Sequence, residues 1–170
     1  TLTCSYLNPA SGTLPVRIAG TALNAAGQPA AACDATGRAL ALSFDATGQA
    51  TASLAYADAG QVRVSARYTG SAAGNDTGLS MSGSTAFVSA PATFAFTGLP
   101  AGTLRAGTPF SATVVARNSA GAATPNFGRE SPVPQVPALR HVKAAPTGPG
   151  SSSGSFSGSL GAFSGGGASA

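Results

Sequence analysis

The chain has 170 residues, of which only 8% are charged, with a formal net charge of +4 and no Trp. This length is enough for one large domain or two small ones with a modest core. The nine Lys and Arg residues are scattered singly rather than gathered in a basic stripe with interleaved aromatics, which argues against nucleic-acid binding.

No apolar run approaches the roughly 20 residues that a helix needs to cross a bilayer, and the N-terminus lacks the basic and apolar regions of a signal peptide. The first residue is not Met. We therefore expect no membrane span in this segment, and we expect the segment to be a processed or excised piece of a longer protein.

The two cysteines, Cys4 and Cys33, are 29 residues apart. Neither belongs to a CxxC motif, and the single histidine, His141, has no second histidine with which to complete a metal site. Two interpretations remain open. The sequence favours a structural disulfide, and the alternative is a pair of buried free thiols.

Apolar residues alternate with period two over 51–68, TASLAYADAGQVRVSARY. The first apolar face holds Ala52, Leu54 and Tyr56, and the face after the turn holds Val62, Val64, Ala66 and Tyr68. The turn at Asp58–Ala59–Gly60 joins the two predicted strands, and Arg63 and Arg67 fall on the opposite, solvated face. Similar turn signals recur every 8–12 residues or so, which predicts an all-β sandwich or barrel.

An internal repeat indicates two domains. The segment 15–27, PVRIAGTALNAAG, aligns with 109–121, PFSATVVARNSAG, at an offset of 94 residues. The identical pairs are Pro15 with Pro109, Ala22 with Ala116, Asn24 with Asn118, Ala26 with Ala120, and Gly27 with Gly121. Because this offset is about the size of one immunoglobulin-like (Ig-like) sandwich, we expect two tandem Ig-like β-sandwich domains at 1–91 and 92–170, joined near 88–94.

The C-terminal tail, GSSSGSFSGSLGAFSGGGASA, has the composition of a flexible linker. Phe156, Leu160 and Phe163 interrupt it at spacings that suit strands. Strands are the favoured interpretation and a disordered tail is the alternative. The segment 48–54 corresponds roughly to 165–170, so we expect the second domain to be incomplete at its C-terminus, without its last strands.

The segment ARNSAGAATPNFGRES, followed by a Gly-rich strand region, resembles the C-terminal domain of the MshQ family of mannose-sensitive haemagglutinin (MSHA) pilus biogenesis proteins. The upstream YADAGQVRVSARY and FVSAPATFAF are similar to the Ig-like module that precedes that domain. The resemblance implies an exported protein at the surface of a Gram-negative bacterium, linked to type IV pili. Cys33 is a departure, because it occupies the place of Phe127 in the repeat.

The five-residue motif Asn126–Phe127–Gly128–Arg129–Glu130 is predicted to be architectural. Phe127 can fill the space between two sheets, and Gly128 permits a sharp turn. The side chains of Arg129 and Glu130 can satisfy each other or nearby backbone groups. An exposed ion pair contributes only about 0–1 kcal/mol, so the pair matters only if it is partly buried or bonded to backbone.

Residues for chemistry are sparse. His141 and Glu130 are the only residues of their kinds, and the four aspartates sit singly in separate turns that explain them. A second histidine or a clustered set of acids would be needed for a catalytic or metal site. We therefore expect no enzyme activity, no cofactor and no metal. The glycosylation-type sequence Asn75–Asp76–Thr77 is expected to be a plain loop.

Two functional classes remain. The leading one is a structural spacer or assembly module of an exported, pilus-associated or cell-surface fibre protein, whose partners are other pilus or surface-fibre subunits and the rest of its own chain. The alternative is an adhesin module that binds a surface glycan or protein. Sugar sites usually offer Trp or Tyr platforms, and this chain has only three Tyr.

Overall fold

The computed structural model describes residues 1–105, 107–140 and 159–169. Its strands form three antiparallel sheets, with a single 3-10 turn, η1 (Ala72–Gly74). Sheet A has the order β1 (Leu2–Asn8), β5 (Gly60–Thr69), β6 (Ser80–Ser89), and sheet B has the order β3 (Thr21–Ala22), β2 (Val16–Ile18), β4 (Leu54–Tyr56). Sheet C has the order β7 (Thr93–Thr97), β8 (Thr113–Arg117), β9 (Gly167–Ser169). The prediction of an all-β fold is confirmed.

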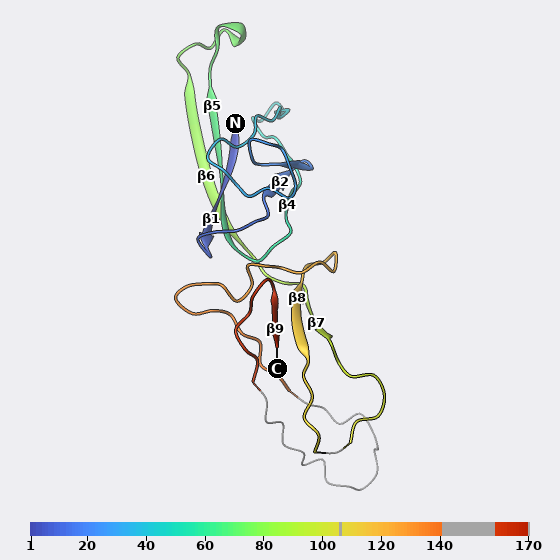
Figure 1. Ribbon diagram of the computed structural model, residues 1–170. Coiled ribbons are helices and arrows are strands. Elements are labelled where there is room, and N and C mark those ends of the chain that lie inside the picture. Colours follow the sequence, from blue (N-terminus) through green and yellow to red (C-terminus); the bar gives the residue numbers. More distant parts are fainter. Residues whose placement is uncertain (106, 141–158, 170) are drawn as a thin grey trace.

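Sheets A and B share the first core. Its buried members come from both sheets and from the loop after β3: Leu2, Cys4, Val16, Ile18, Leu23, Val62 and Val64. The alternation in β5 points Val62 and Val64 inward, and Arg63 and Arg67 are exposed as predicted. Ala66 lies on the same face of β5 as Val62 and Val64 but is exposed. Its partner, Leu2, is the first residue of β1, so the three-stranded part of sheet A ends here. The β5–β6 hairpin reaches beyond that end of β1 (Figure 1).

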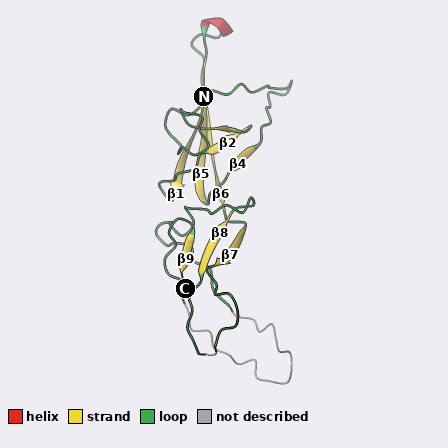
Figure 2. Cartoon of the chain, turned by 45° about the vertical axis from the view of Figure 1, so that its right-hand side comes forward, coloured by secondary structure: helices red, strands yellow, loops and turns green. Residues whose placement is uncertain are grey.

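The turn at Asp58–Gly60 does not close a hairpin. β4 pairs with β2 in sheet B, whereas β5 pairs with β1 and β6 in sheet A. The chain therefore crosses from one sheet to the other at this corner, and the corner lies at the end of the sandwich that faces sheet C (Figures 1 and 2).

A second core lies against sheet C. It comprises Ala59, Val114, Ala116, Phe127, Phe163 and Ala168. Phe127 lies edge-on to Phe94 and Phe163, with ring centroids 5.4 and 5.0 Å away. Ala59 comes from the corner between β4 and β5, so the second core includes a residue from the N-terminal part of the chain. The division at 91/92 remains a prediction, and it falls between β6 and β7.

The predicted repeat recurs in the turn geometry. Gly27 N donates to Asn24 O over 3.0 Å, and Gly121 N donates to Asn118 O over 2.9 Å. Both glycines have positive φ, 65° and 80°. In each turn the asparagine side-chain oxygen also accepts a backbone N–H four residues on, over 3.0 Å. The Asn-x-Ala-Gly sequence thus builds the same turn twice.

The tail differs from the prediction in the position of its strand. Phe163 is buried in the second core, but the strand, β9, begins only at Gly167. Gly165 and Gly166 have φ values of 59° and 85°, which lets the chain turn before it pairs with β8. The other expected aromatic, Phe156, lies outside the described residues.

Sheet C is only partly covered on the face that carries the second core. Phe94 pairs with Ala116, and Phe96 pairs with Val114, so both phenylalanines share the face of the buried residues. They remain 45% and 55% exposed. Within the described residues, the second core therefore lacks the opposing sheet that a complete sandwich would place there.

Candidate functional site: the joint between the two cores

The corner Asp58–Gly60 and the loop Asn126–Glu130 meet in a contact that we call the joint. Asp58 is 1% exposed, and its Oδ1 accepts backbone N–H groups from Ala59 over 2.8 Å and from Asn126 over 2.9 Å. Its Oδ2 is buried and has no hydrogen-bond partner among the described residues. Burial raises the pKa of Asp58, against the effect of these hydrogen bonds and of the charge of Arg129.

Asn126 is the polar centre of the joint. It is 1% exposed; its Nδ2 donates to the hydroxyl of Tyr56 over 3.3 Å, and its Oδ1 accepts from Arg129 over 3.3 Å. Burial, together with the nearby charge of Asp58, raises the pKa of Tyr56, so this hydroxyl stays neutral and able to accept. The backbone of Gly12 lies directly against Asn126, because a Cβ at residue 12 would be only 2.8 Å from Asn126 Nδ2.

Two further contacts flank this centre. Asn8 and Ser131 form a reciprocal pair in which the amide of Asn8 donates to Ser131 O and accepts from Ser131 N, both over 2.9 Å. Asn118 Nδ2 donates to Ala57 O over 2.8 Å. The N-terminal sheets and sheet C are thus connected at three places by hydrogen bonds whose directions are fixed.

The structure separates Arg129 from Glu130. Arg129 donates to Asn126 Oδ1 and, over 3.4 Å, to Ser11 Oγ, whereas Glu130 Oε2 accepts the backbone N–H of Gln135 over 3.1 Å. The arginine therefore acts on the joint and the glutamate on its own loop. Of the two predicted alternatives, the glutamate follows the second, since it accepts from a nearby backbone group, whereas the arginine bonds to side chains.

Phe127 and Gly128 hold the loop against the second core. Phe127 is 8% exposed and fills the core, as its position in the motif suggested. Gly128 has φ +79°, and a Cβ at this position would lie 2.3 Å from Phe163 Cβ. The backbone therefore comes closer to Phe163 here than any side chain would permit.

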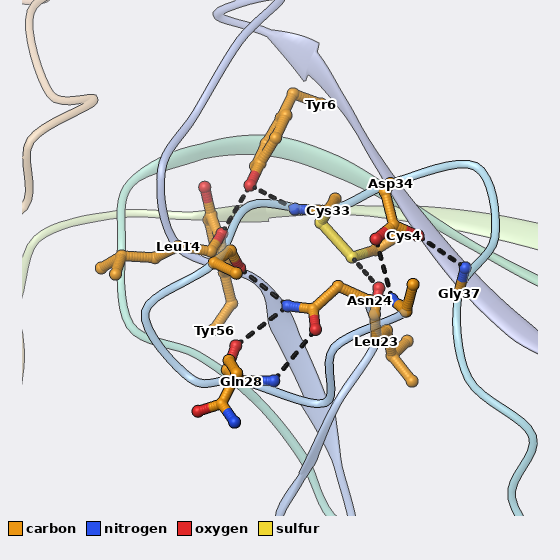
Figure 3. Close-up of a disulfide and its surroundings, with 12 residues drawn as sticks. Cys4, Tyr6, Leu14, Leu23, Asn24, Gln28, Cys33, Asp34, Gly37 and Tyr56 are labelled. Carbon is orange, nitrogen blue, oxygen red and sulfur yellow. Dashed lines mark hydrogen bonds between the residues drawn. A yellow bond between two sulfur atoms is a disulfide. The ribbon is translucent and has the colours of Figure 1, made fainter.

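Cys4 and Cys33 form a disulfide with a Cα–Cα distance of 5.3 Å (Figure 3). The backbone N–H of Cys33 donates to the hydroxyl of Tyr6 over 2.9 Å, and this hydroxyl donates to Leu14 O over 2.8 Å. Cys33, the repeat counterpart of Phe127, packs against the first core as Phe127 fills the second. A covalent link and an aromatic ring thus occupy corresponding places.

A groove of about 550 Å³ runs beside the joint, bordered by Asn8, Gln61, Val88, Phe127, Glu130 and Val133, among others. Glu130 is the one titratable side chain among its described lining residues. An acid–base pair needs a second such group. The described residues also contain no group of three or more potential metal ligands. No helix among the described residues is long and apolar enough to cross a membrane. His141 lies outside the described residues.

Sequence reasoning missed the role of Asp58, whose carboxylate it explained by turn chemistry alone. Turn chemistry does account for Asp45, which accepts the N–H groups of Thr47 and Gln49. A signal for the joint was present in the repeat, because the counterparts of Asn126 and Arg129 are Ala32 and Ala35. Asn126 and Arg129 are thus polar residues that depart from the repeat and contact the N-terminal part of the chain.

Comparison with known proteins finds a similar family for the first part of the chain. Residues 1–84 match the family model described as "Domain of unknown function (DUF6701), first Ig-like domain". Neither the curated proteins nor the solved structures yield a match. The match covers β1 to β5 and the first half of β6, that is, sheets A and B without the end of β6, together with their disulfide. The N-terminal part of this chain is therefore an Ig-like β-sandwich similar to the first Ig-like domain of the DUF6701 family.

Proposed function

We propose that the chain is a structural spacer or assembly module of an exported, type IV pilus-associated or cell-surface fibre protein, of the MshQ-like class. The joint carries this proposal. Three sets of directional hydrogen bonds connect parts of the chain that are 61 to 123 residues apart, at Asn118, Asn126 and Asn8. Such contacts fix the orientation of one β-unit on the next, which is what a spacer requires.

Apolar packing supports the same role. Ala59 is 1% exposed and belongs to the second core, so a change in the angle between the sheets would expose both the alanine and the ring of Phe127. Burial of this kind favours contact without fixing direction, and the hydrogen bonds of the joint supply the direction. Together they make the two β-units one body.

The setting in the proposal is extracellular. A disulfide is stable in an oxidising compartment, and Ig-like sandwiches are common in surface proteins. We assign no catalytic act to the chain, and we expect its partners to be other fibre or pilus subunits and the rest of its own chain.

The adhesin alternative gains less support. Of the three residues that could carry such a site, Tyr56 is turned into the joint, where it accepts from Asn126, and Arg129 donates to the same asparagine. Tyr68 is exposed but donates to Asp76 near the hairpin tip. None of the three forms part of a shared open platform.

Distance measurements between spin labels test the spacer role. Labels at Thr77 and Leu99, both exposed, report from the β5–β6 hairpin and from the loop after β7. We expect one narrow distance distribution in the wild-type background and a clearly broader one with Asn126→Ala. Gln49→Ala, an exposed change outside the joint and in neither labelled loop, is the matched control and should leave the distribution narrow.

A broad distribution in the wild-type background would refute the rigid spacer. A glycan array and intact host cells test the alternative. Saturable binding that is lost on substitution of Tyr56, Tyr68 or Arg129 would favour the adhesin role instead.

A further inference from the structure

The outer edge of β6 is open. β6 pairs with β5 over all ten of its residues in an unbroken register, from Gly60↔Ser89 to Thr69↔Ser80. Among the described residues, no strand pairs with its other side. Proteins usually protect such edges with a Lys, a Pro, a bulge or a very short strand. The sequence of β6, SMSGSTAFVS, contains no charged residue and no proline.

The opposite edge of the same sheet is protected. β1 is seven residues long, and its register with β5 shifts between Tyr6 and Asn8. Its first residue is also covered, because Leu2 and Arg38 exchange two backbone hydrogen bonds of 2.7 Å each. Sheet A thus shields the β1 edge and leaves the β6 edge long, regular and neutral.

The sequence of β6 complements itself when a second copy runs antiparallel with Ser84 on the two-fold axis. Opposite residues in an antiparallel pair lie on the same face of the sheet. On the face of β6 that continues the core, this register places Met81 against Phe87 of the other copy. On the solvated face it places Ser82 against Ala86 and Ser80 against Val88. Met81 is 54% exposed and Val88 is 72% exposed, so both have apolar surface to bury.

Charge does not oppose this pairing. The nearest cations on sheet A are Arg63 and Arg67, which lie on β5, one strand in from the edge. In the paired sheet, the β5 strands of the two copies are three strand spacings apart, roughly 14 Å. At this separation, exposed charges are largely screened at physiological ionic strength. The uncharged edge, in turn, offers no preference for an acidic or a basic partner.

We propose that β6 is an association strand through which two copies of this chain join their A sheets into one continuous antiparallel sheet, with Ser84 on the two-fold axis. The contact is isologous and closes on itself, so it yields a dimer. It is independent of the joint and lies along the side of the first sandwich rather than at its end. Two spacer chains paired in this way would run antiparallel, side by side.

Sedimentation equilibrium over a range of concentrations tests the association. The monomer mass is 16.2 kDa, and we expect the weight-average mass to rise toward twice this value below about 1 mM, the weak end of specific binding. Ser84→Lys brings two like charges together at the axis and should raise the dissociation constant at least tenfold. Ser84→Thr keeps a neutral strand residue and should still dimerise.

Cysteine cross-linking tests the register. With Ser84→Cys, the two thiols are opposite each other, and Cα atoms about 4.5–5.5 Å apart across an antiparallel pair are close enough for a disulfide. We expect oxidation to give a covalent dimer with this variant. Ser82→Cys is the matched control, because in this register the two Ser82 residues are roughly 14 Å apart, beyond disulfide reach.

Peptide mapping must place the new disulfide between the two copies of residue 84, with Cys4–Cys33 intact. A wild-type chain that stays monomeric to about 1 mM overturns the proposal. So does a dimer that Ser84→Lys leaves unchanged, or one in which Ser82→Cys cross-links as well as Ser84→Cys. Far-ultraviolet circular dichroism of each variant shows that the fold is retained.

Discussion

Asp58 and Asn126 are 68 residues apart in the chain, yet a carboxylate oxygen of the aspartate accepts the backbone N–H of the asparagine over 2.9 Å, with both residues 1% exposed. This single contact connects the corner where the chain passes between sheets A and B to the loop that fills the core against sheet C. The aspartate satisfies two backbone donors with one oxygen, while its other oxygen is buried and finds no partner in the part of the chain that the structure describes.

Asp58→Ala should lower the free energy of unfolding by about 1–3 kcal/mol, because it leaves the buried N–H of Asn126 without its acceptor. Asp58→Asn should cost less or be neutral at pH 7, since it keeps an acceptor oxygen and removes the buried charge. Urea denaturation of both variants measures the difference. Equal losses in the two variants would show that the negative charge, rather than the acceptor, matters.

The contribution of Asp58 to stability should fall as pH rises. Burial raises its folded pKa above the ordinary value of 3.8, so the folded chain holds the proton more tightly than the unfolded chain does. Stability from this residue is therefore greatest below 3.8, decreases as pH rises from 3.8 to the folded pKa, and is constant above it.

The pH dependence of Asp34, Asp45 and Asp76 has the opposite sign, because hydrogen bonds lower their pKa values. The measurement is therefore the difference in the free energy of unfolding between wild type and Asp58→Asn, taken across the acid range. Tyr6 and Tyr56 stay neutral there, since their pKa values are raised above 10.0. A difference that stays flat or rises with pH contradicts the prediction.

Gly128→Ala should destabilise the chain more than Gly121→Ala. The two glycines have nearly equal φ angles, 79° and 80°, so the backbone cost of alanine, roughly 1–2 kcal/mol, is shared. At residue 128 the new Cβ would meet Phe163, at 2.3 Å, whereas at residue 121 no atom of the described residues beyond its chain neighbours lies within 4 Å. We expect an additional loss of about 1–3 kcal/mol from this overlap. Thermal melting of both variants compares them directly, and equal shifts would show that Phe163 moves aside freely.

Replacing both Cys4 and Cys33 with Ala should lower the free energy of unfolding by about 3–4 kcal/mol in the chain-entropy model. The unfolded chain would no longer be constrained by the link across 29 residues. Intact mass after alkylation without reductant gives the redox state of the wild-type protein. Two added alkyl groups on the folded chain would contradict the disulfide, and an unchanged melting temperature in the double variant would remove its structural role.

The sequence was sufficient for those features that depend on neighbours along the chain. Val62 and Val64 alternate with Arg63, and this pattern alone predicts which of them are buried. The turns at Asn24 and Asn118 follow from short sequences that require Gly at positive φ. In both cases the determining groups are within a few residues of one another.

The joint could not be derived in this way. Whether Asp58 serves a turn or an inter-sheet contact depends on where residue 126 lies in space, and nothing within several residues of Asp58 specifies that. The different partners of Arg129 and Glu130 depend likewise on Ser11 and on Gln135. The position of β9 was also missed, since a Gly- and Ser-rich tail has a weak alternation and its pairing with β8 is set by the core around Phe163.

Because Ala59 belongs to the second core, the corner at Asp58–Gly60 is completed late when the chain folds during synthesis. A chain made from its N-terminus has every residue of the first core by residue 64 and all of sheet A by residue 89, but Ala59 gains Phe127, Phe163 and Ala168 only much later. Until then, the corner lacks these apolar neighbours, and Asp58 lacks the N–H of Asn126. During synthesis, the first sandwich therefore exists for a time with an unfinished end, at which the buried surface of Ala59 is still open to water.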